Sequence, residues 1–363
     1  MRPSVHTQLV NGSFGDPALL IDFKFERRAL LFDLGDVAAL STKQLLRVSD
    51  AFVTHAHMDH FAGFDHLLRV CLGRDTGITL YGPRGFAAQV GHKLAAYTWN
   101  VIENYETEFV VTAHEVHPDW HVEGARHSSR TRFAPEPLAA RELEPGLLVE
   151  EPGFRIRAAF LDHNTPCLAF LFEEAVHINV LKSELEAMGL PTGPWLTELR
   201  RKVREGAPAD TPVTIRWRDR GGHRERILDV GELRRRLLQL VPGQRIAYAT
   251  DLAMTEDNAE RLAALARGAD LFYIEAAFLS ADADHARRKS HLTAGFAGGI
   301  ATRAGVREAV PFHFSTRYLG EGEALEREFA AAHRRDRPAV EQPLMRDDMG
   351  FRRRAPTSGD EPG

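Results

Sequence analysis

The sequence predicts an α/β fold in which short apolar strands alternate with helices and end in polar, metal-ligating residues. Residues 51–53 and 271–274 are apolar runs of strand length, and histidines or a carboxylate follow them closely. Residues 256–267 form a helical segment between two predicted strands. Layered folds collect functional groups at one edge of a sheet, so we expect the polar strand ends to form one site.

The predicted elements cover most of the chain. Gly82 and Pro83 end one strand, and alternating polar and apolar residues support another at 154–161. The predicted strands are 17–23, 29–33, 51–54, 78–81, 107–116, 154–161, 168–173, 245–251, 271–275 and 309–314. The predicted helices are 42–48, 61–69, 85–96, 256–267, 292–303 and 321–335.

Residues 176–241 break this alternation, and we interpret them as an arm inserted into the main domain. The arm is expected to contain helices at 183–190, 195–205 and 232–240, and a hairpin across Gly221 and Gly222. Residues 198–245 hold 13 Arg and Lys against 7 Asp and Glu, although the whole chain has a net charge of −5. Such a segment is either an electrostatic footprint for phosphate or a solvated helix face, and charge alone supports both equally.

The composition sets further limits. A chain of 363 residues with 44% hydrophobic content can form one domain over 1–335, with a polar tail at 340–363 that we predict to be disordered. No run reaches the roughly 18 apolar residues of a membrane span, and no apolar signal core is present near Met1, so we expect a cytoplasmic protein. Cys71 and Cys167 are too few for a disulfide framework and are expected to be buried thiols.

Residues 54–60, Thr-His-Ala-His-Met-Asp-His, concentrate four candidate metal ligands. His55 and His57 are two residues apart at a strand end, so their rings should point to the same side. A turn through Met58 would bring Asp59 and His60 back toward the same pocket. Imidazole and carboxylate ligands suit zinc, with manganese and iron as alternatives.

Later strand ends carry further candidate ligands, and together with the motif they are enough for two metal ions. Two ions roughly 3.5–4 Å apart can hold a hydroxide between them and stabilise the charge that develops during an in-line displacement. We expect one ion to be bound by His55, His57 and His163 and the other by Asp59, His60 and His313, with Asp251 bridging them.

A second group of histidines lies at His114, His117, His121 and His127. Their spacing matches no ligand pattern, and the prolines and charges around them are typical of a surface loop. We therefore interpret them as solvent-exposed histidines without a function.

The pattern H-x-H-x-D-H at 55–60, followed by the later histidines and Asp251, resembles the metallo-β-lactamase superfamily over residues 17–320. This resemblance implies an αββα sandwich. Residues 274–278, 291–293 and 313–318 resemble three motifs of the ribonuclease Z branch, which matures the 3′ ends of precursor transfer RNAs. Gly193 and Pro194 resemble the Gly-Pro motif of the arm on which that branch holds transfer RNA.

The resemblance implies roles for individual residues. Asp59 would be both a metal ligand and the general base for the attacking water. His291, oriented by Glu275, would stabilise the scissile phosphate or protonate the leaving oxygen, whereas without a function the pair would be a structural salt bridge or helix cap. The resemblance also implies two zinc ions per subunit and a homodimer in which one arm serves the other active site. The arm residues expected to clamp precursor transfer RNA are Gly193, Pro194, Arg200, Arg201 and Lys202.

Three other functions use parts of the same pattern. The same chemistry on a small phosphodiester, such as a cyclic nucleotide, fits the loops at 9–15 and 35–39, which differ from the branch, but leaves the arm without a purpose. A thioester or lactam hydrolase would explain residues 55–60 but not the pair of Glu275 and His291. A non-catalytic RNA-binding module would have no use for the complete ligand set.

Overall fold

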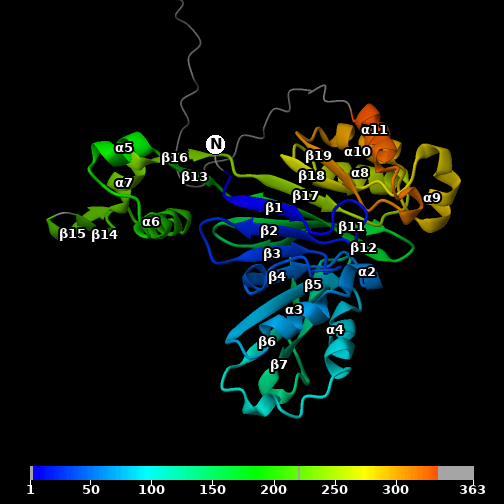
Figure 1. The fold of residues 1–363 in the computed structure, drawn as a ribbon, viewed down its shortest axis with the longest axis horizontal. Coiled ribbons are helices and arrows are strands. Elements are labelled where there is room, and N and C mark those ends of the chain that lie inside the picture. Colours follow the sequence, from blue (N-terminus) through cyan, green and yellow to red (C-terminus); the bar gives the residue numbers. More distant parts are fainter. Residues whose placement is uncertain (1–2, 220, 334–363) are drawn as a thin grey trace, which may run out of the picture.

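The computed structural model describes residues 3–219 and 221–333, so the tail predicted at 340–363 lies outside the described residues. The main body consists of two stacked sheets with helices on both outer faces (Figure 1). The predicted αββα sandwich is therefore confirmed. Within the described part of the chain, none of the helices combines the length and apolar character that a bilayer span requires.

The first sheet contains the N-terminal strands. Strands β3 to β6 are parallel neighbours, so their C-terminal ends lie at the same edge. The order across the sheet is β1-β2-β3-β4-β5-β6-β7-β8, and β9 also pairs with β7. The strands are β1 (Val5–Leu9), β2 (Leu19–Phe23), β3 (Ala29–Phe32), β4 (Val48–Phe52), β5 (Thr76–Pro83), β6 (Phe109–Val116), β7 (His121–Ser128), β8 (Pro135–Pro137) and β9 (Arg141–Glu142).

The second sheet has the order β10-β11-β12-β17-β18-β19. Strands β17, β18 and β19 are parallel, and β11 has the same direction because β12 is antiparallel to both β11 and β17. Four strands therefore end at one edge. The strands are β10 (Leu147–Glu150), β11 (Phe154–Asp162), β12 (Pro166–Glu174), β17 (Arg245–Ala249), β18 (Leu271–Glu275) and β19 (Ala309–Phe312).

An aromatic core joins the two sheets. Phe32 and Phe52 of the first sheet face Phe170 and Tyr248 of the second, and all four side chains are fully buried. The ring centroids of Phe32 and Phe170 are 5.4 Å apart, and those of Phe32 and Tyr248 are 5.7 Å apart. Burial of one such ring contributes about 1.5–3 kcal/mol, so this core holds the sheets at a fixed spacing.

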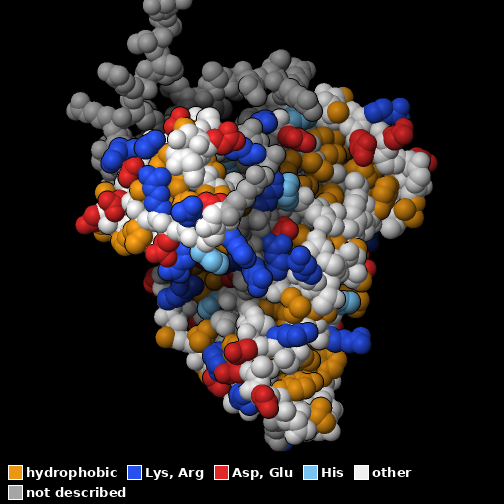
Figure 2. Space-filling model, turned by 60° about the vertical axis from the view of Figure 1, so that its left-hand side comes forward, with side chains coloured by type: hydrophobic (Ala, Val, Ile, Leu, Met, Phe, Trp, Pro, Cys, Tyr) orange, Lys and Arg blue, Asp and Glu red, His pale blue; other side chains and the backbone are white. Residues whose placement is uncertain are grey.

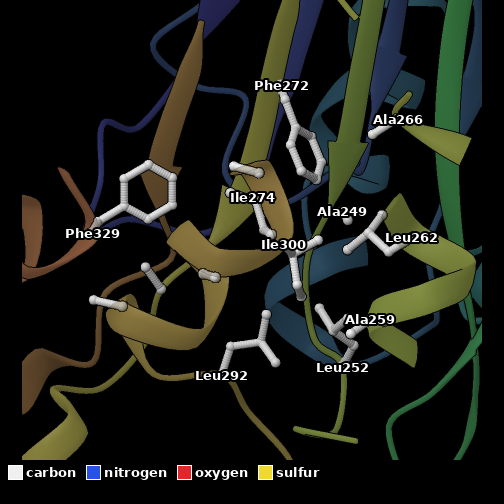
Figure 3. Packing of buried hydrophobic residues seen from close by; sticks show 14 of the residues in the cluster. Ala249, Leu252, Ala259, Leu262, Ala266, Phe272, Ile274, Leu292, Ile300 and Phe329 are labelled. Carbon is white, nitrogen blue, oxygen red and sulfur yellow. The ribbon is translucent and has the colours of Figure 1, made fainter. Parts of the chain in front are cut away.

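The outer layers are helical. On the second sheet, Leu262 of α8 and Ile300 of α10 pack against Phe272 and Ile274 (Figure 3). The helices on the first sheet are α1 (Thr42–Leu45), α2 (Met58–Phe61), α3 (Phe64–Cys71) and α4 (Phe86–Ala95), and those on the second are α8 (Glu256–Leu265), α9 (Ala283–Lys289), α10 (Ala294–Ala304) and α11 (Gly322–Ala332). Short 3-10 turns lie at Ile102–Asn104, Ser129–Thr131, Ser280–Asp282 and Thr316–Tyr318.

Residues 176–241 project from the side of the sandwich (Figure 1). They have a core of their own, which includes Leu199, Val213 and Leu233. Arg204 fastens this arm to the body through Glu26, at 2.6 Å. The elements of the arm are β13 (His177–Val180), α5 (Lys182–Ala187), α6 (Trp195–Arg204), β14 (Pro212–Asp219), β15 (Gly222–Asp229), α7 (Val230–Leu237) and β16 (Leu238–Val241).

The structure corrects three expectations. The helix predicted at 61–69 is divided into α2 and α3, and Gly63 between them lies so close to Gly35 that a Cβ there would be 2.0 Å from its carbonyl oxygen. The surface loop predicted at 113–121 is instead the end of β6 and a tight hairpin into β7. The exposed location expected for His127 is also wrong, since its ring is buried and Nδ1 donates to the carbonyl of Phe133 at 3.0 Å.

Candidate metal centre

Residues from both sheets meet where the strands end. His55 and His57 follow β4 in the first sheet, and His163 follows β11 in the second. Asp251 and His313 lie just beyond β17 and β19. The structure therefore brings together residues that are up to 258 positions apart in the sequence.

One group consists of His55, His57, His163 and Asp251, whose ligand atoms all lie within 4.8 Å of one another. Asp251 Oδ2 is 3.6 Å from His55 Nε2 and 3.4 Å from His163 Nε2. Three imidazoles and a carboxylate at these separations can surround a single metal ion.

A second group consists of Asp59, His60 and His313, again with ligand atoms within 4.8 Å. Asp251 belongs to this group as well, because Oδ2 is 3.4 Å from His60 Nε2 and Oδ1 is 2.9 Å from His313 Nδ1. Its carboxylate thus lies between the two groups. The other six residues predicted as ligands lie around this one carboxylate.

The nitrogen atoms of the centre fit a bound metal. His55 Nε2 and His60 Nε2 are buried, and neither has a hydrogen-bond partner among residues 3–219 and 221–333. Burial, reinforced by His60, lowers the pKa of His55 to about 2, so its imidazole is neutral and has a free lone pair. Burial raises the pKa of Asp251, but His313 and His60 outweigh this effect and hold it well below its usual range.

Asp33, which sequence reasoning assigned no role, orients two of these histidines. His60 Nδ1 donates to Asp33 Oδ2 at 3.0 Å, which leaves Nε2 free to face the centre. His55 Nδ1 donates to Thr54 Oγ1 at 3.1 Å, and Thr54 Oγ1 donates in turn to Asp33 Oδ2 at 3.0 Å. Carboxylates that hold the second nitrogen of a ligating histidine are typical of metal sites. The sequence could have indicated this role, because Asp33 ends a predicted strand as the candidate ligands do.

Glu275 and His291 form a pair beside the centre. His291 Nδ1 donates to Glu275 Oε2 at 2.8 Å, and the other oxygen of Glu275 accepts from the backbone of Leu252 at 2.9 Å and of Leu292 at 3.3 Å. Burial lowers the pKa of His291, but Glu275 outweighs it and raises the pKa above its ordinary value. Because His291 Nδ1 lies 3.9 Å from Asp251 Oδ1, the pair adjoins the predicted ligands.

Several of these residues have an unusual backbone. The φ angles of Asp33, Asp251 and His313 are 58°, 52° and 56°, in the left-handed region. Asp and His tolerate this region better than most residues, yet it is uncommon away from glycine. Asp33 and His313 directly follow β3 and β19, and Asp251 is the second residue after β17, so the reversal turns each side chain from the sheet into the centre.

The comparisons with known proteins decide the family. No protein-family model matches the chain. The ribonuclease Z of Deinococcus radiodurans is 33% identical over 292 residues, which cover 80% of this chain and 83% of the relative. The ribonuclease Z of Thermobifida fusca is 32% identical over 307 residues, 83% of this chain and 79% of the relative. This chain belongs to the ribonuclease Z family. It is therefore a metal-dependent hydrolase of the metallo-β-lactamase superfamily.

Solved structures show a similar arrangement at lower identity. The short form of human tRNase Z has a TM-score of 0.47 and 19% identity, and covers 86% of this chain and 93% of its own. The metallo-β-lactamase fold protein YhfI from Bacillus subtilis has a TM-score of 0.49 and 15% identity, and covers 89% and 91%. Because both TM-scores are below 0.5, the family assignment rests on the sequence relatives.

The predicted arm residues of this ribonuclease Z family member lie apart from the metal centre, on or just before α6. The guanidinium of Arg200 lies over the ring of Phe25, 4.2 Å from its centroid. Lys202 donates to the carbonyl of Pro212 at 2.7 Å and pairs with Glu198. Arg201 is exposed, and Gly193 and Pro194 form the turn that precedes α6. Arg201 also pairs with Glu205 at 2.6 Å, so all three predicted cations have partners within the protein.

We expect Asp33→Asn to weaken zinc binding about 10–100-fold, because His60 and Thr54 lose the charged acceptor that orients them. The affinity is measured by competition with a chelator of known zinc affinity, and circular dichroism checks that the variant is folded. The control is Asp257→Asn, which changes an exposed side chain of α8. It should bind zinc as the wild type does. An unchanged affinity in a folded Asp33→Asn protein would contradict the orienting role.

Proposed function

We propose that this protein is an endoribonuclease with a dinuclear metal centre that hydrolyses precursor transfer RNA at its 3′ end. The observation that carries the proposal is that six candidate ligands lie around the carboxylate of Asp251, with the pair of Glu275 and His291 beside them. Its relatives named ribonuclease Z support the class of substrate. We also propose a cytoplasmic location, with which the two buried free thiols of Cys71 and Cys167 agree.

Two zinc ions are the proposed cofactors, with manganese or iron as alternatives. The candidate ligands are five imidazoles and two carboxylates, and both types suit these metals. When bound, the two ions supply an activated water and stabilise the negative charge that develops on the phosphate. The residues proposed to hold them are His55, His57 and His163 for one, Asp59, His60 and His313 for the other, and Asp251 between them.

Asp59 is the proposed general base. Its carboxylate is partly exposed, with a side-chain exposure of 43%, so it can reach the substrate side of the centre. Burial raises its pKa, but His313 and His60 outweigh that and hold the pKa well below its usual range. Asp59 is therefore ionised at neutral pH and can accept a proton from the attacking water.

His291 is the proposed group that acts on the leaving oxygen. The carboxylate of Glu275 binds Nδ1, which fixes the ring and leaves Nε2 for the substrate. Because Glu275 raises the pKa of His291, a protonated imidazole is available to donate a proton or a hydrogen bond to the phosphate. Glu275 acts through His291 and is a positioning residue.

The arm is proposed to bind the body of the RNA. Lys and Arg side chains are distributed over the arm and the adjoining face of the body (Figure 2). Since the arm points away from the metal centre of its own chain (Figure 1), we propose a homodimer in which each arm serves the other active site. Light scattering on the purified protein should give twice the mass of the chain.

The first experiment is a cleavage assay with purified protein and zinc or manganese. It offers a precursor transfer RNA with a 3′ trailer in parallel with bis-p-nitrophenyl phosphate. Cutting at the trailer junction is the expected result. Hydrolysis of the small diester with the precursor left intact would overturn the proposed substrate and favour a small phosphodiester.

We expect Asp59→Ala to lower the cleavage rate at least 10²-fold, because both a metal ligand and the base are lost. Elemental analysis of the same sample should show less bound metal than in the wild type. Asp257→Ala serves as the control and should cut at the normal rate. A variant Asp59→Ala that still cuts within a few-fold of the wild type would remove the general-base role.

We expect His291→Ala and Glu275→Gln each to lower kcat with little change in bound metal. Because Glu275 acts through His291, the double variant should be no slower than His291→Ala alone. Single-turnover rates of the four proteins on the precursor measure this. Losses that multiply in the double variant would mean that the two residues act independently.

We expect the triple variant Arg216→Gln, Arg218→Gln and Arg224→Gln in the β14–β15 hairpin to weaken RNA binding and reduce its salt dependence. Each lost phosphate contact lowers the slope of log K against log salt by about 1. The control neutralises Arg261 and Arg303, two exposed cations on α8 and α10. Hydrolysis of the small diester should not change. An unaltered slope in the triple variant would exclude these residues from the RNA contact.

A further inference from the structure

A second group of metal-ligating side chains lies on the β6–β7 hairpin, outside the centre described above. Glu115 and Glu123 are directly opposite each other in the antiparallel register. Two residues further toward the tip, the backbone N–H of His117 donates to the carbonyl of His121 at 2.9 Å. Residues two apart on a strand share a face, so the two glutamates and the two histidines are on the same face of the hairpin.

The ligand atoms of this group are close together. Those of Glu115, His117 and Glu123 lie within 4.8 Å of one another. His117 Nε2 is 3.2 Å from Glu115 Oε1, and His121 Nε2 is 3.1 Å from Glu123 Oε1. The centroids of the two imidazole rings are 5.6 Å apart. These separations resemble those in the catalytic centre, where the corresponding atoms are 3.4–3.6 Å apart.

One nitrogen atom of the group, Nε2 of His117, makes no hydrogen bond within residues 3–219 and 221–333. This nitrogen is buried and lies 3.2 Å from Glu115 Oε1. The same condition holds for His55 Nε2 and His60 Nε2 in the catalytic centre. A buried imidazole nitrogen beside a carboxylate oxygen, without hydrogen-bond geometry, is the arrangement that a shared metal ion produces.

The group is rich in carboxylates, and His121 lies between two of them, Glu123 and Glu142. Like charges directly opposite on neighbouring strands destabilise a sheet, and Glu115 and Glu123 form such a pair. Glu142 of β9 adds a third carboxylate, 3.2 Å from His121 Nδ1. A divalent cation between the two strands would offset this repulsion.

The tip of the hairpin is rigid enough to hold a fixed geometry. Trp120 has a φ of 66°, and its backbone N–H donates to the carbonyl of His117 at 2.8 Å. The Trp120 ring packs against Phe160 of the second sheet with centroids 5.5 Å apart. The side chain of Asp119 accepts from the backbone N–H of His121 at 3.2 Å. The two histidines are thus pre-positioned by contacts that do not involve a metal.

We propose that Glu115, His117 and Glu123 bind an additional divalent transition-metal ion, most suitably Zn²⁺, and that His121 joins them when its Nε2 is released from Glu123. Two imidazoles and two carboxylates form the mixed nitrogen and oxygen set that tetrahedral zinc accepts. The site lies beside the turn of the hairpin. This turn is at the same sheet edge as residues 55–60, and β6 is two strands away from β4. It does not depend on the proposed nuclease activity.

The test counts zinc per chain by elemental analysis after dialysis against buffered zinc. The wild type is compared with His117→Ala/His121→Ala and with a control, His92→Ala/His223→Ala, which removes two exposed histidines elsewhere. The hairpin variant should bind one ion fewer than the wild type, and the control should match the wild type. Equal zinc counts in all three proteins would overturn the proposal.

A second variant keeps the test decisive if the histidine variant does not fold. Glu115→Gln/Glu123→Gln removes the repulsion between the strands and preserves the size of both side chains. Without zinc, its Tm should be no lower than that of the wild type, and it should bind one ion fewer. A Tm that falls without zinc, together with an unchanged zinc count, would mean that the glutamates act only as structural ion-pair partners.

Discussion

The carboxylate of Asp33 connects the aromatic core, the metal-binding motif and both sheets. It is fully buried at the end of β3, where it accepts from the backbone and hydroxyl of Thr54, from His60, and from the phenol of Tyr248 on the other sheet at 2.9 Å. A buried charge without such donors would cost several kcal/mol, and breaking a buried ionic contact costs about 3–5 kcal/mol. The same bonds therefore support the packing of the sheets and direct His55 and His60 toward the candidate metal centre.

The candidate metal centre lies at strand ends where three residues have left-handed backbone conformations. The sandwich behind them supports these conformations. Left-handed backbone at Asp33, Asp251 and His313 costs on the order of 1 kcal/mol or more at each position. Each preceding strand pairs in parallel with one neighbour, and the hydrogen bonds of Asp33 add to this support. Strain is thus placed at the strand ends because the rigid layers behind them hold it there.

The arm shows that net charge and binding surface are different properties. Arg200 packs on Phe25, and Arg204 pairs with Glu26, so part of the positive charge attaches the arm to the body. Such attachment keeps the arm at a fixed orientation relative to the body. The cations of the β14–β15 hairpin are more exposed, and their partners are local carboxylates such as Glu225 and Asp219.

The sequence by itself determined the α/β class and the grouping of the seven candidate ligands, because apolar periodicity and ligand spacing are local properties. The αββα sandwich was implied by the resemblance to the metallo-β-lactamase superfamily. The sequence did not reveal Asp33 as an orienting group, since its partner Tyr248 is 215 positions away. It also misjudged His127, which is buried because β6 and β7 pair. It could not show that Arg200 lies over Phe25 of the body. Only the tertiary structure decides these, because each depends on contacts between segments that pack together after the sheets have formed.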